Sequence, residues 1–332
     1  MYTKIMNKKK IIFDTDIGCD DAVALVALLL NENIEIEAIT CVKGNLKVDD
    51  VVSNALKVTH LCDKDIPVYK GCNTPMVRDM LKGRDHNTIM QRIRMEVDGK
   101  PVVIHEPSFN LPLPERKPEK KHAVSYIVDR LTETNEKIDI VAIGPLTNIA
   151  MAIRMEPSII DNIGTIYIMG GGLYKGNRTP VAEANFYDDP EAAEIVLTSG
   201  AKCLIVPLEA CEMGVTYTNE DLEEIKKVNN KISDFLYEEL HGYIDRCNLL
   251  FNESIKSCCV YDYAAVAPLI DESVILKKKQ EVVRVDFSAG MSDGQMVVDR
   301  RGNTPQLSTE IVYEMDSTKL HNILLEELKN WN

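Results

Sequence analysis

The sequence predicts an α/β fold, in which a mainly parallel, Rossmann-like central sheet is flanked by helices. Three observations lead to this prediction. Short apolar runs of strand length alternate with helical patterns, and such alternation requires βαβ crossovers, which build parallel sheets. Polar residues or tight turns follow several of these runs. No repeat, low-complexity tract or clear linker divides the chain, so we expect a single domain over residues 1–332.

The elements follow from the local pattern in chain order. Buried strands are predicted at the apolar runs 11–13, 34–42, 66–69, 138–143, 165–169 and 203–208. Helices are predicted where apolar residues recur at helical spacing, at 20–30, 48–61, 122–134, 146–155 and 190–199. Further along, the pattern predicts a charged helical region at 219–250, a buried helix at 263–270, a hairpin at 282–298 and an amphipathic helix at 320–331. The irregular segment 74–121 is long enough to be functional or mobile.

Charge and composition exclude several classes of protein. The net charge of -14 argues against a protein that grips nucleic acid, which needs a positive face, and against docking on anionic membranes. No segment has the length of a signal-peptide core or a membrane span, so the cytoplasm is the expected compartment. The nine cysteines include no CxxC pair, which indicates buried, reduced thiols.

Polar residues collect where the predicted strands end. Asp14 and Asp16 follow the first strand, and Asn45 follows the second. The turns 144–148 and 170–172 follow two later strands. The carboxyl ends of parallel strands meet at one edge of the sheet, so we expect a functional site there.

Four aspartates fall within eight residues, at a strand end, a glycine turn and a helix start: Asp14, Asp16, Asp20 and Asp21. A single Asp at a helix start could be an ordinary N-terminal cap. Four in one turn would repel one another unless a cation or protons neutralise them. Carboxylate oxygens suit Ca²⁺ or Mg²⁺ better than zinc, so the cluster predicts a site for such an ion.

Two families of enzymes begin with a strand of this kind. Haloacid-dehalogenase-like phosphatases carry DxDx[TV] after the first strand, but Gly18 stands where Thr or Val is expected. The second acidic pair, Asp20 and Asp21, also follows at once. The better match is the inosine-uridine-preferring nucleoside hydrolase family, whose opening is DxDxGxDD. Residues 14–21 resemble that opening, and residues 38–45, 144–150, 169–177 and 182–193 resemble its later Gly-Asn, GPLTN, MGGG…GN and AEFN…DPEAA blocks in the same order.

The resemblance implies a Ca²⁺ site. The carboxylates of Asp16, Asp21 and Asp262 would bind the ion, together with the backbone carbonyl of Thr147. Asp262 belongs to a segment similar to the family's late HDP motif. Asp14 would orient the loop instead of binding the ion.

The resemblance also implies how the sugar is held. Asp16 would take a proton from the water that attacks C1′. The ribose hydroxyls would be gripped by Asp20, Asn45, Asn177, Glu183 and Asn185. Carboxylate and amide oxygens around the sugar would stabilise the oxocarbenium-like charge that develops as the N-glycosidic bond breaks.

The base half of the site departs from the family pattern. Many members have His before the late Asp, as acid to the leaving base, and here that position is Tyr261. A phenol is protonated at neutral pH, so Tyr261 could donate a proton or hydrogen bond, or stack on the base. His86, in the long loop, and His241, in the charged helical region, are the other candidates for contact with the base.

We therefore expect calcium-dependent hydrolysis of a ribonucleoside with a purine or purine-like base. A modified base such as a 7-deazapurine, and a nucleoside- or ribose-binding protein without turnover, are the alternatives. The expected partner is a small-molecule ribonucleoside, with no nucleic acid and no membrane. By family pattern the chain would assemble as a homodimer or homotetramer.

Overall fold

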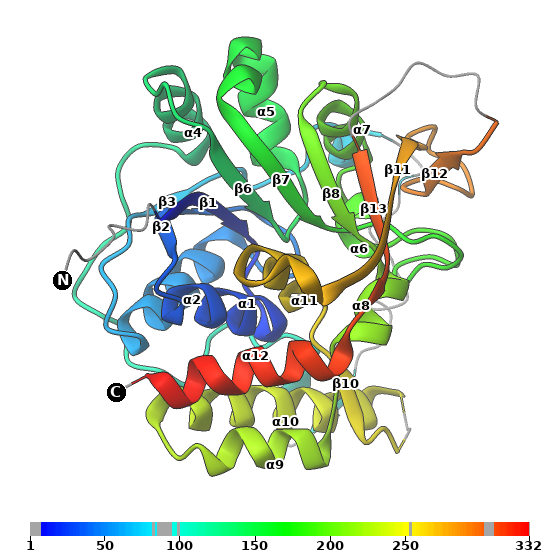
Figure 1. The fold of residues 1–332 in the computed structure, drawn as a ribbon. Helices are drawn as coiled ribbons and strands as arrows, with labels where there is room; N and C mark the ends of the chain where they lie inside the picture. The colour runs from blue at the N-terminus through cyan, green and yellow to red at the C-terminus, as the bar shows by residue number, and fades with distance from the viewer. Residues whose placement is uncertain are drawn as a thin grey trace.

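The computed structural model describes residues 8–81, 84, 95–97, 100–251, 254–301 and 309–331. Within these residues the largest sheet has nine strands in the order β12-β11-β13-β8-β7-β6-β1-β2-β3 (Figure 1). The strands are β1 (Lys9–Thr15), β2 (Ile34–Cys41), β3 (Val68–Lys70), β6 (Ile138–Ala142), β7 (Ile163–Met169), β8 (Lys202–Val206), β11 (Ile275–Val285), β12 (Met296–Asp299) and β13 (Thr309–Met315). All neighbours from β13 to β3 pair in parallel, whereas β11 pairs antiparallel with β13 and β12. The predicted mainly parallel α/β fold is confirmed.

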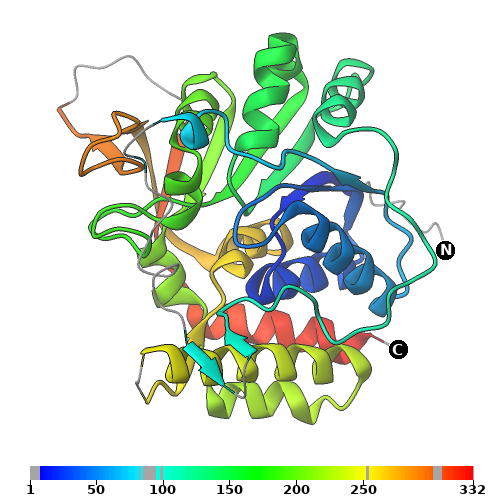
Figure 2. The same ribbon diagram turned by 180° about the vertical axis from the view of Figure 1, so that it is seen from behind.

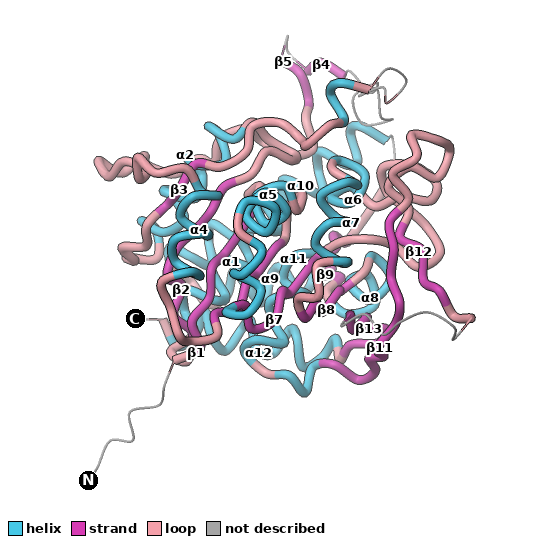
Figure 3. Tube along the Cα trace, turned by 90° about the horizontal axis from the view of Figure 1, so that it is seen from above, coloured by secondary structure: helices cyan, strands magenta, loops and turns pink. Residues whose placement is uncertain are grey.

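Helices cover both faces of this sheet (Figures 1 and 2). They are α1 (Cys19–Leu30), α2 (Val48–Leu61), α4 (Ala123–Thr132), α5 (Thr147–Met155), α6 (Ala184–Asp188), α7 (Pro190–Thr198), α8 (Leu208–Gly214), α9 (Asn219–Lys227), α10 (Lys231–Phe251), α11 (Tyr261–Ile270) and α12 (Ser317–Asn330). Seen from above, α4, α5 and α7 lie in a row over one face (Figure 3). On the other face lie α1, α2, α8, α11 and α12, and α9 and α10 lie beyond α12.

The strands supply a hydrophobic core on each face. Ile11 and Phe13 of β1 pack into the cluster with α1 and α11, whereas Ile12 packs into the cluster with α4 and α5. Successive side chains of a strand point to opposite faces, so a strand between two layers of helices must be apolar throughout. This is why the first strand could be read as a continuous apolar run.

Smaller elements complete the described part of the chain. Two antiparallel pairs are formed by β4 (Met95–Val97) with β5 (Lys100–Val102) and by β9 (Thr216–Thr218) with β10 (Ser257–Cys259). Short 3₁₀ helices occur at η1 (Arg78–Met80), η2 (Pro157–Asn162) and η3 (Glu272–Val274). The predicted hairpin is present, with β11 and β12 paired from Val282 opposite Asp299 to Val285 opposite Met296. None of the described helices is long and apolar enough to span a membrane.

The order of the strands determines at which point along the sheet a ligand-binding crevice forms. From β1 the chain proceeds to β2 and β3 on one side, and β6, β7 and β8 follow on the other side of β1. The sheet therefore changes direction of winding between β1 and β6. A crevice forms beyond the carboxyl ends of the strands at such a point, and ligands bind there in open α/β sheets.

Candidate active site

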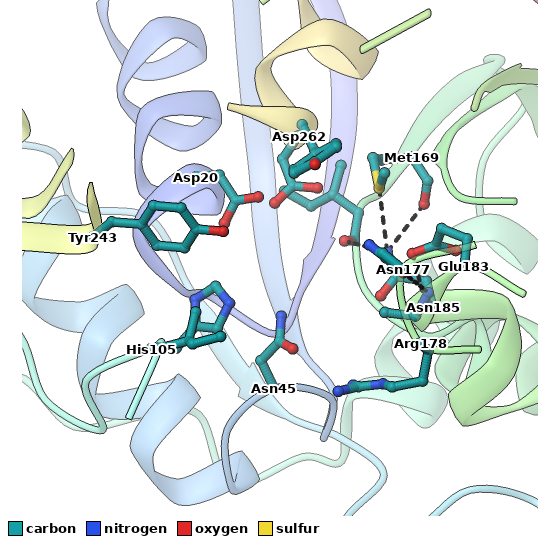
Figure 4. Close-up of a pocket in the computed structure, with 14 residues that line it drawn as sticks. Asp20, Asn45, His105, Met169, Asn177, Arg178, Glu183, Asn185, Tyr243 and Asp262 are labelled. Atoms are coloured by element: carbon teal, nitrogen blue, oxygen red, sulfur yellow. Dashed lines mark hydrogen bonds between the residues drawn. The ribbon is translucent and has the colours of Figure 1, made fainter. Parts of the chain in front are cut away.

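A pocket lies beyond the carboxyl ends of β1, β2, β6 and β7 (Figure 4). Its lining consists of Asp20, Asn45, Ile104, His105, Ile143, Met169, Asn177, Arg178, Glu183, Ala184, Asn185, Tyr243, Tyr261 and Asp262. Seven residues that the sequence singled out are among them: Asp20, Asn45, Asn177, Glu183, Asn185, Tyr261 and Asp262. The fold thus gathers segments more than 200 residues apart around one small cavity.

A carboxylate cluster forms one end of the pocket. Oxygens of Asp20, Asp21 and Asp262 lie within 4.8 Å of one another. Asp20 and Asp21 lie in the first turn of α1, and Asp262 lies in the first turn of α11. Asp21 is fixed by two local donors, the hydroxyl of Thr15 at 2.6 Å and the N–H of Gly18 at 2.8 Å. The two helices pack against each other, which brings their N-termini and acidic residues together.

Asp16 is buried behind the lining and is fitted closely between two glycines. Its Oδ2 accepts the backbone N–H of Asn45 at 2.7 Å. A Cβ on Gly44 would lie 2.1 Å from Oδ2, and a Cβ on Gly144 would lie 2.8 Å from Oδ1. Only residues without a side chain leave room for the carboxylate in this position.

The carboxylates of this region are held in an unfavourable electrostatic environment. Burial, followed by repulsion from neighbouring carboxylates, raises the pKa of Asp16 and of Asp262 well above the ordinary range. The same causes raise the pKa of Asp20 to about 7. A divalent cation would relieve this repulsion, and a donor set made of carboxylate oxygens suits a hard ion. The residues present therefore fit a metal of the Ca²⁺ or Mg²⁺ class.

The opposite side of the pocket carries amide and carboxylate groups fixed by the backbone. Glu183 caps α6 and accepts the N–H groups of Gly171 at 2.9 Å and Asn185 at 2.8 Å. Burial raises the pKa of Glu183 to about 7, and these hydrogen bonds oppose the shift. The amide nitrogen of Asn185 donates to the carbonyls of Ile143 and Met169, so its oxygen is the atom left for a ligand. These contacts preorganise polar atoms toward the cavity (Figure 4).

Asn177 and Arg178 lie beside this polar wall. The Asn177 oxygen accepts the N–H of Ala184 at 2.9 Å, which leaves its amide nitrogen for a ligand. Arg178 forms an ion pair with Asp188 at 3.0 Å. Asp188, Glu183 and Asp16 together raise the pKa of Arg178, since each favours the charged guanidinium.

Asp14 does not face the pocket. Its Oδ2 accepts hydrogen bonds from the Thr40 hydroxyl at 2.5 Å and the Asn148 amide at 2.8 Å. Asn148 also donates to the carbonyl of Cys41 at the end of β2. Asp14 thereby links β1 to β2 and to the start of α5.

The third side of the pocket is aromatic. It is formed by Tyr243 of α10, Tyr261 of α11 and His105, and the rings of His105 and Tyr243 lie 5.9 Å apart between centroids. Burial raises the pKa of both tyrosines, which therefore stay protonated at neutral pH. Burial, with smaller contributions from the nearby charges of Arg246 and Arg178, lowers the pKa of His105 to about 4, so His105 is neutral.

Comparison with known proteins decides the family. The model of the inosine-uridine preferring nucleoside hydrolase family matches residues 11–322. The chain belongs to this family. It is 33% identical over 325 residues to the inosine-uridine preferring nucleoside hydrolase of Crithidia fasciculata, which covers 97% of this chain and 98% of that protein. It is 33% identical over 299 residues to the pyrimidine-specific ribonucleoside hydrolase RihB of Escherichia coli, covering 90% and 89%.

Solved structures agree with this assignment. The purine-preferring ribonucleoside hydrolase from Gardnerella vaginalis superposes with a TM-score of 0.84 at 27% identity, covering 97% of this chain and 99% of that one. As a nucleoside hydrolase, the chain is an enzyme that acts on N-glycosyl compounds. The names of the relatives specify different bases, so membership of the family does not determine which base this enzyme accepts.

His241 and Thr147, which the sequence also singled out, are not among the residues that line the pocket. His241 lies on the exposed side of α10, where its Nδ1 is 3.3 Å from Asp245, and it is two residues from Tyr243, on another face of the helix. Thr147 is the first residue of α5, so its carbonyl is directed along the helix, and its hydroxyl donates to Asp189 at 2.6 Å. The prediction for His86 lies outside the described residues.

Seven of the lining residues were not predicted as site residues, among them Ile143, His105, Arg178 and Tyr243. Ile143 directly follows β6, before the GPLTN turn, and lines the pocket, and its carbonyl accepts a hydrogen bond from Asn185 at 3.0 Å. His105 belongs to the irregular segment 74–121, which was predicted to be functional or mobile, but no local pattern distinguished it from His86. Arg178 directly follows Asn177, and Tyr243 lies two residues after His241. Arg178 and Tyr243 were therefore each close in sequence to a residue that the pattern did single out.

Proposed function

We propose that this nucleoside hydrolase is a Ca²⁺-dependent ribonucleoside N-ribohydrolase that releases ribose and a free base, with purine or purine-like bases favoured. The observation that carries the proposal is the division of the pocket. Carboxylates of Asp20, Asp21 and Asp262 occupy one end, amides and Glu183 form the second wall, and aromatic rings form the third. A sugar with several hydroxyls and a flat base needs these three kinds of surface.

The cation would be held by Asp16, Asp21 and Asp262, with the carbonyl of Ile143 replacing that of Thr147 as the backbone ligand. An ion at this position would supply a Lewis acid that makes water more acidic and interacts with the ribose hydroxyls. Ca²⁺ is favoured over Mg²⁺ because the donors come from separate segments, and Ca²⁺ tolerates irregular oxygen geometry.

Side chains of the protein would accept the proton, bind the ribose and stabilise the developing charge. Asp16 is the proposed base, because its Oδ2 is occupied by the Asn45 N–H and its Oδ1 is left to accept a proton. Asp20, Asn45 and Asn177 bind ribose hydroxyls, together with Glu183 and Asn185. Their oxygens stabilise the positive charge that develops on the sugar as the bond to the base breaks.

The leaving base needs a hydrogen-bond donor or a proton. Tyr261 lies in the pocket and is protonated, so its hydroxyl can donate. His105, which is neutral, is the second candidate for contact with the base and takes the place predicted for His241 and His86. The rings of Tyr243 and Tyr261 offer stacking surfaces, and a purine presents a larger face to them than a pyrimidine does. This comparison supports the purine preference.

The test is a reducing-sugar assay with inosine, adenosine, guanosine, uridine, cytidine and a 7-deazaguanosine, before and after treatment with EDTA. Asp16→Ala is expected to lose at least about a hundredfold in kcat, as expected for removal of a general base. Tyr261→Phe is expected to lose activity on bases that need protonation while ribose binding is kept. Faster release from pyrimidines than from purines would overturn the purine preference. Binding of nucleosides without any release would indicate a binding protein.

Calcium is tested on the same samples by metal analysis. One Ca²⁺ per chain is expected in the wild type and none in Asp262→Ala. Bound Mg²⁺ in place of Ca²⁺ would contradict the assignment of the ion. Assembly as a homodimer or homotetramer stays a prediction, for which sedimentation velocity is the measurement.

A further inference from the structure

A second set of metal-binding groups lies at the pocket, next to the carboxylate cluster. The thiol of Cys19, a carboxylate oxygen of Asp20 and a ring nitrogen of His105 all lie within 4.8 Å of one another. This set differs in chemistry from the first, because it combines sulfur, nitrogen and oxygen. Such a mixed set is typical of Zn²⁺ and unsuited to Ca²⁺.

His105 has an unused donor atom at this point. Its Nδ1 is buried and has no hydrogen-bond partner. A Cβ on Gly18 would lie 2.5 Å from Nδ1, so the nitrogen is packed directly on the turn that precedes Cys19. Buried polar nitrogens normally have a partner, and one without a partner is an indication of a missing ligand.

The geometry needs little adjustment to hold one ion. The thiol of Cys19 lies 4.0 Å from Oδ1 of Asp20. Ligand atoms around a tetrahedral zinc lie about 3.5 Å apart, given metal–ligand lengths of about 2.0 to 2.3 Å. Cys19 is buried, and its thiol, which is neutral in the absence of an ion, would release a proton on binding the ion.

We propose that Cys19, Asp20 and His105 form an inhibitory site for a divalent cation that prefers nitrogen and sulfur, with Zn²⁺ as its representative. Three protein ligands leave the fourth tetrahedral position to water. The ion would hold the carboxylate of Asp20, which the proposed function assigns to the ribose, and the ring of His105, which faces the base. Inhibition therefore rests on the proposed function, whereas binding does not.

Binding is tested without activity. Full-length protein saturated with Ca²⁺ is titrated with Zn²⁺ by calorimetry, and with Co²⁺ by absorption spectroscopy. We expect one Zn²⁺ per chain, and with Co²⁺ a sulfur-to-metal absorption band. Cys19→Ser is expected to weaken Zn²⁺ at least tenfold and to abolish the band. Cys62→Ser, which changes a buried thiol at the end of α2, is the matched control and is expected to bind as the wild type does.

Two results would overturn the site. One is the absence of Zn²⁺ uptake by the calcium-saturated wild type. The other is equal affinity in the wild type and in Cys19→Ser, with Cys19→Ala used if the serine variant does not fold. Ribose release in the presence of Zn²⁺ then tests inhibition, which we expect to be at least tenfold weaker in Cys19→Ser. Failure of ribose release without Zn²⁺ would refute the proposed function and leave the binding result unaffected.

Discussion

At the scale of single residues, the position of the Asp16 carboxylate depends on the absence of a side chain at Gly44 and Gly144. A Cβ on Gly44 would meet both Oδ2 of Asp16 and, at 2.8 Å, the ring of Pro145. Neither can move away easily, so Gly44→Ala is expected to displace the carboxylate and lower kcat about a hundredfold, as small displacements of catalytic groups do. Gly290→Ala is the matched control, because its Cβ would meet only Ser288 at 3.5 Å. Equal kcat values for the two variants would contradict the close fit.

Glu183 gives a prediction for pH. Burial raises its pKa from 4.5 to about 7. As pH rises past 4.5, the unfolded chain loses this proton while the folded chain keeps it until about 7, so the free energy of unfolding falls over that window by up to about 3 kcal/mol. Glu183→Gln removes this dependence. Urea unfolding at about pH 5 and about pH 8 should show a smaller fall for the variant, and parallel curves would refute the raised pKa.

The residue scale also shows what one sequence can reveal. The aspartates and asparagines of the pocket could be singled out because each stands in a short segment that resembles a motif of the family. His105 was not predictable, because its place in the pocket depends on how a long segment folds back over α2. The backbone ligand was predicted at Thr147, whereas Ile143 is the residue of this segment that lines the pocket, since a backbone ligand has no side-chain signature in a sequence.

At the scale of elements, the segment that carries His105 is anchored to helices. Lys57 of α2 is buried and donates to the Ser108 hydroxyl at 2.6 Å and to the Phe109 carbonyl at 2.8 Å. From α10, Arg246 donates to the Ile104 carbonyl at 2.9 Å. These bonds hold the backbone on both sides of His105 against the pocket.

Loss of this anchor should affect binding more than chemistry. Lys57→Met keeps the apolar stem and removes the donors, so we expect KM to rise about tenfold with kcat nearly unchanged, and a loss of about 1 to 3 kcal/mol in stability. Lys64→Met, on the exposed turn after α2, is the control. An equal fall in kcat and kcat/KM for Lys57→Met would mean that the segment acts in the chemical step and not in binding.

Element boundaries were the less predictable part of the fold. The region 219–250 has one continuous helical pattern, yet α9 ends at Lys227 and α10 begins at Lys231. Asn229 lies between them with a φ of 59°. Asn tolerates this left-handed conformation better than most residues, but it can also lie in a helix, so the pattern alone could not place the break. The strands were recognised more readily because burial on both faces makes them apolar throughout.

At the scale of the whole molecule, the proposed calcium joins distant parts of the chain. Asp16 precedes α1 and Asp21 lies in its first turn, whereas Asp262 lies in the first turn of α11, and their carboxylates repel one another in the absence of an ion. A ligand that binds only the folded state stabilises it by about 2.7 kcal/mol at a hundred times its Kd. Calcium should therefore raise the Tm of the entire chain by several degrees in one transition.

The extent to which calcium binding at the carboxylate cluster stabilises the fold can be measured with two variants. Asp262→Asn removes one charge from the cluster, so we expect a higher Tm than the wild type in EDTA and a much smaller increase on addition of calcium. Asp286→Asn, in the loop between β11 and β12, removes the same charge far from the site and should respond to calcium as the wild type does. A calcium-induced shift of Tm that is the same in Asp262→Asn and in the wild type would place the ion elsewhere. The repulsion that destabilises the metal-free fold is thus the same property that makes the site bind a cation.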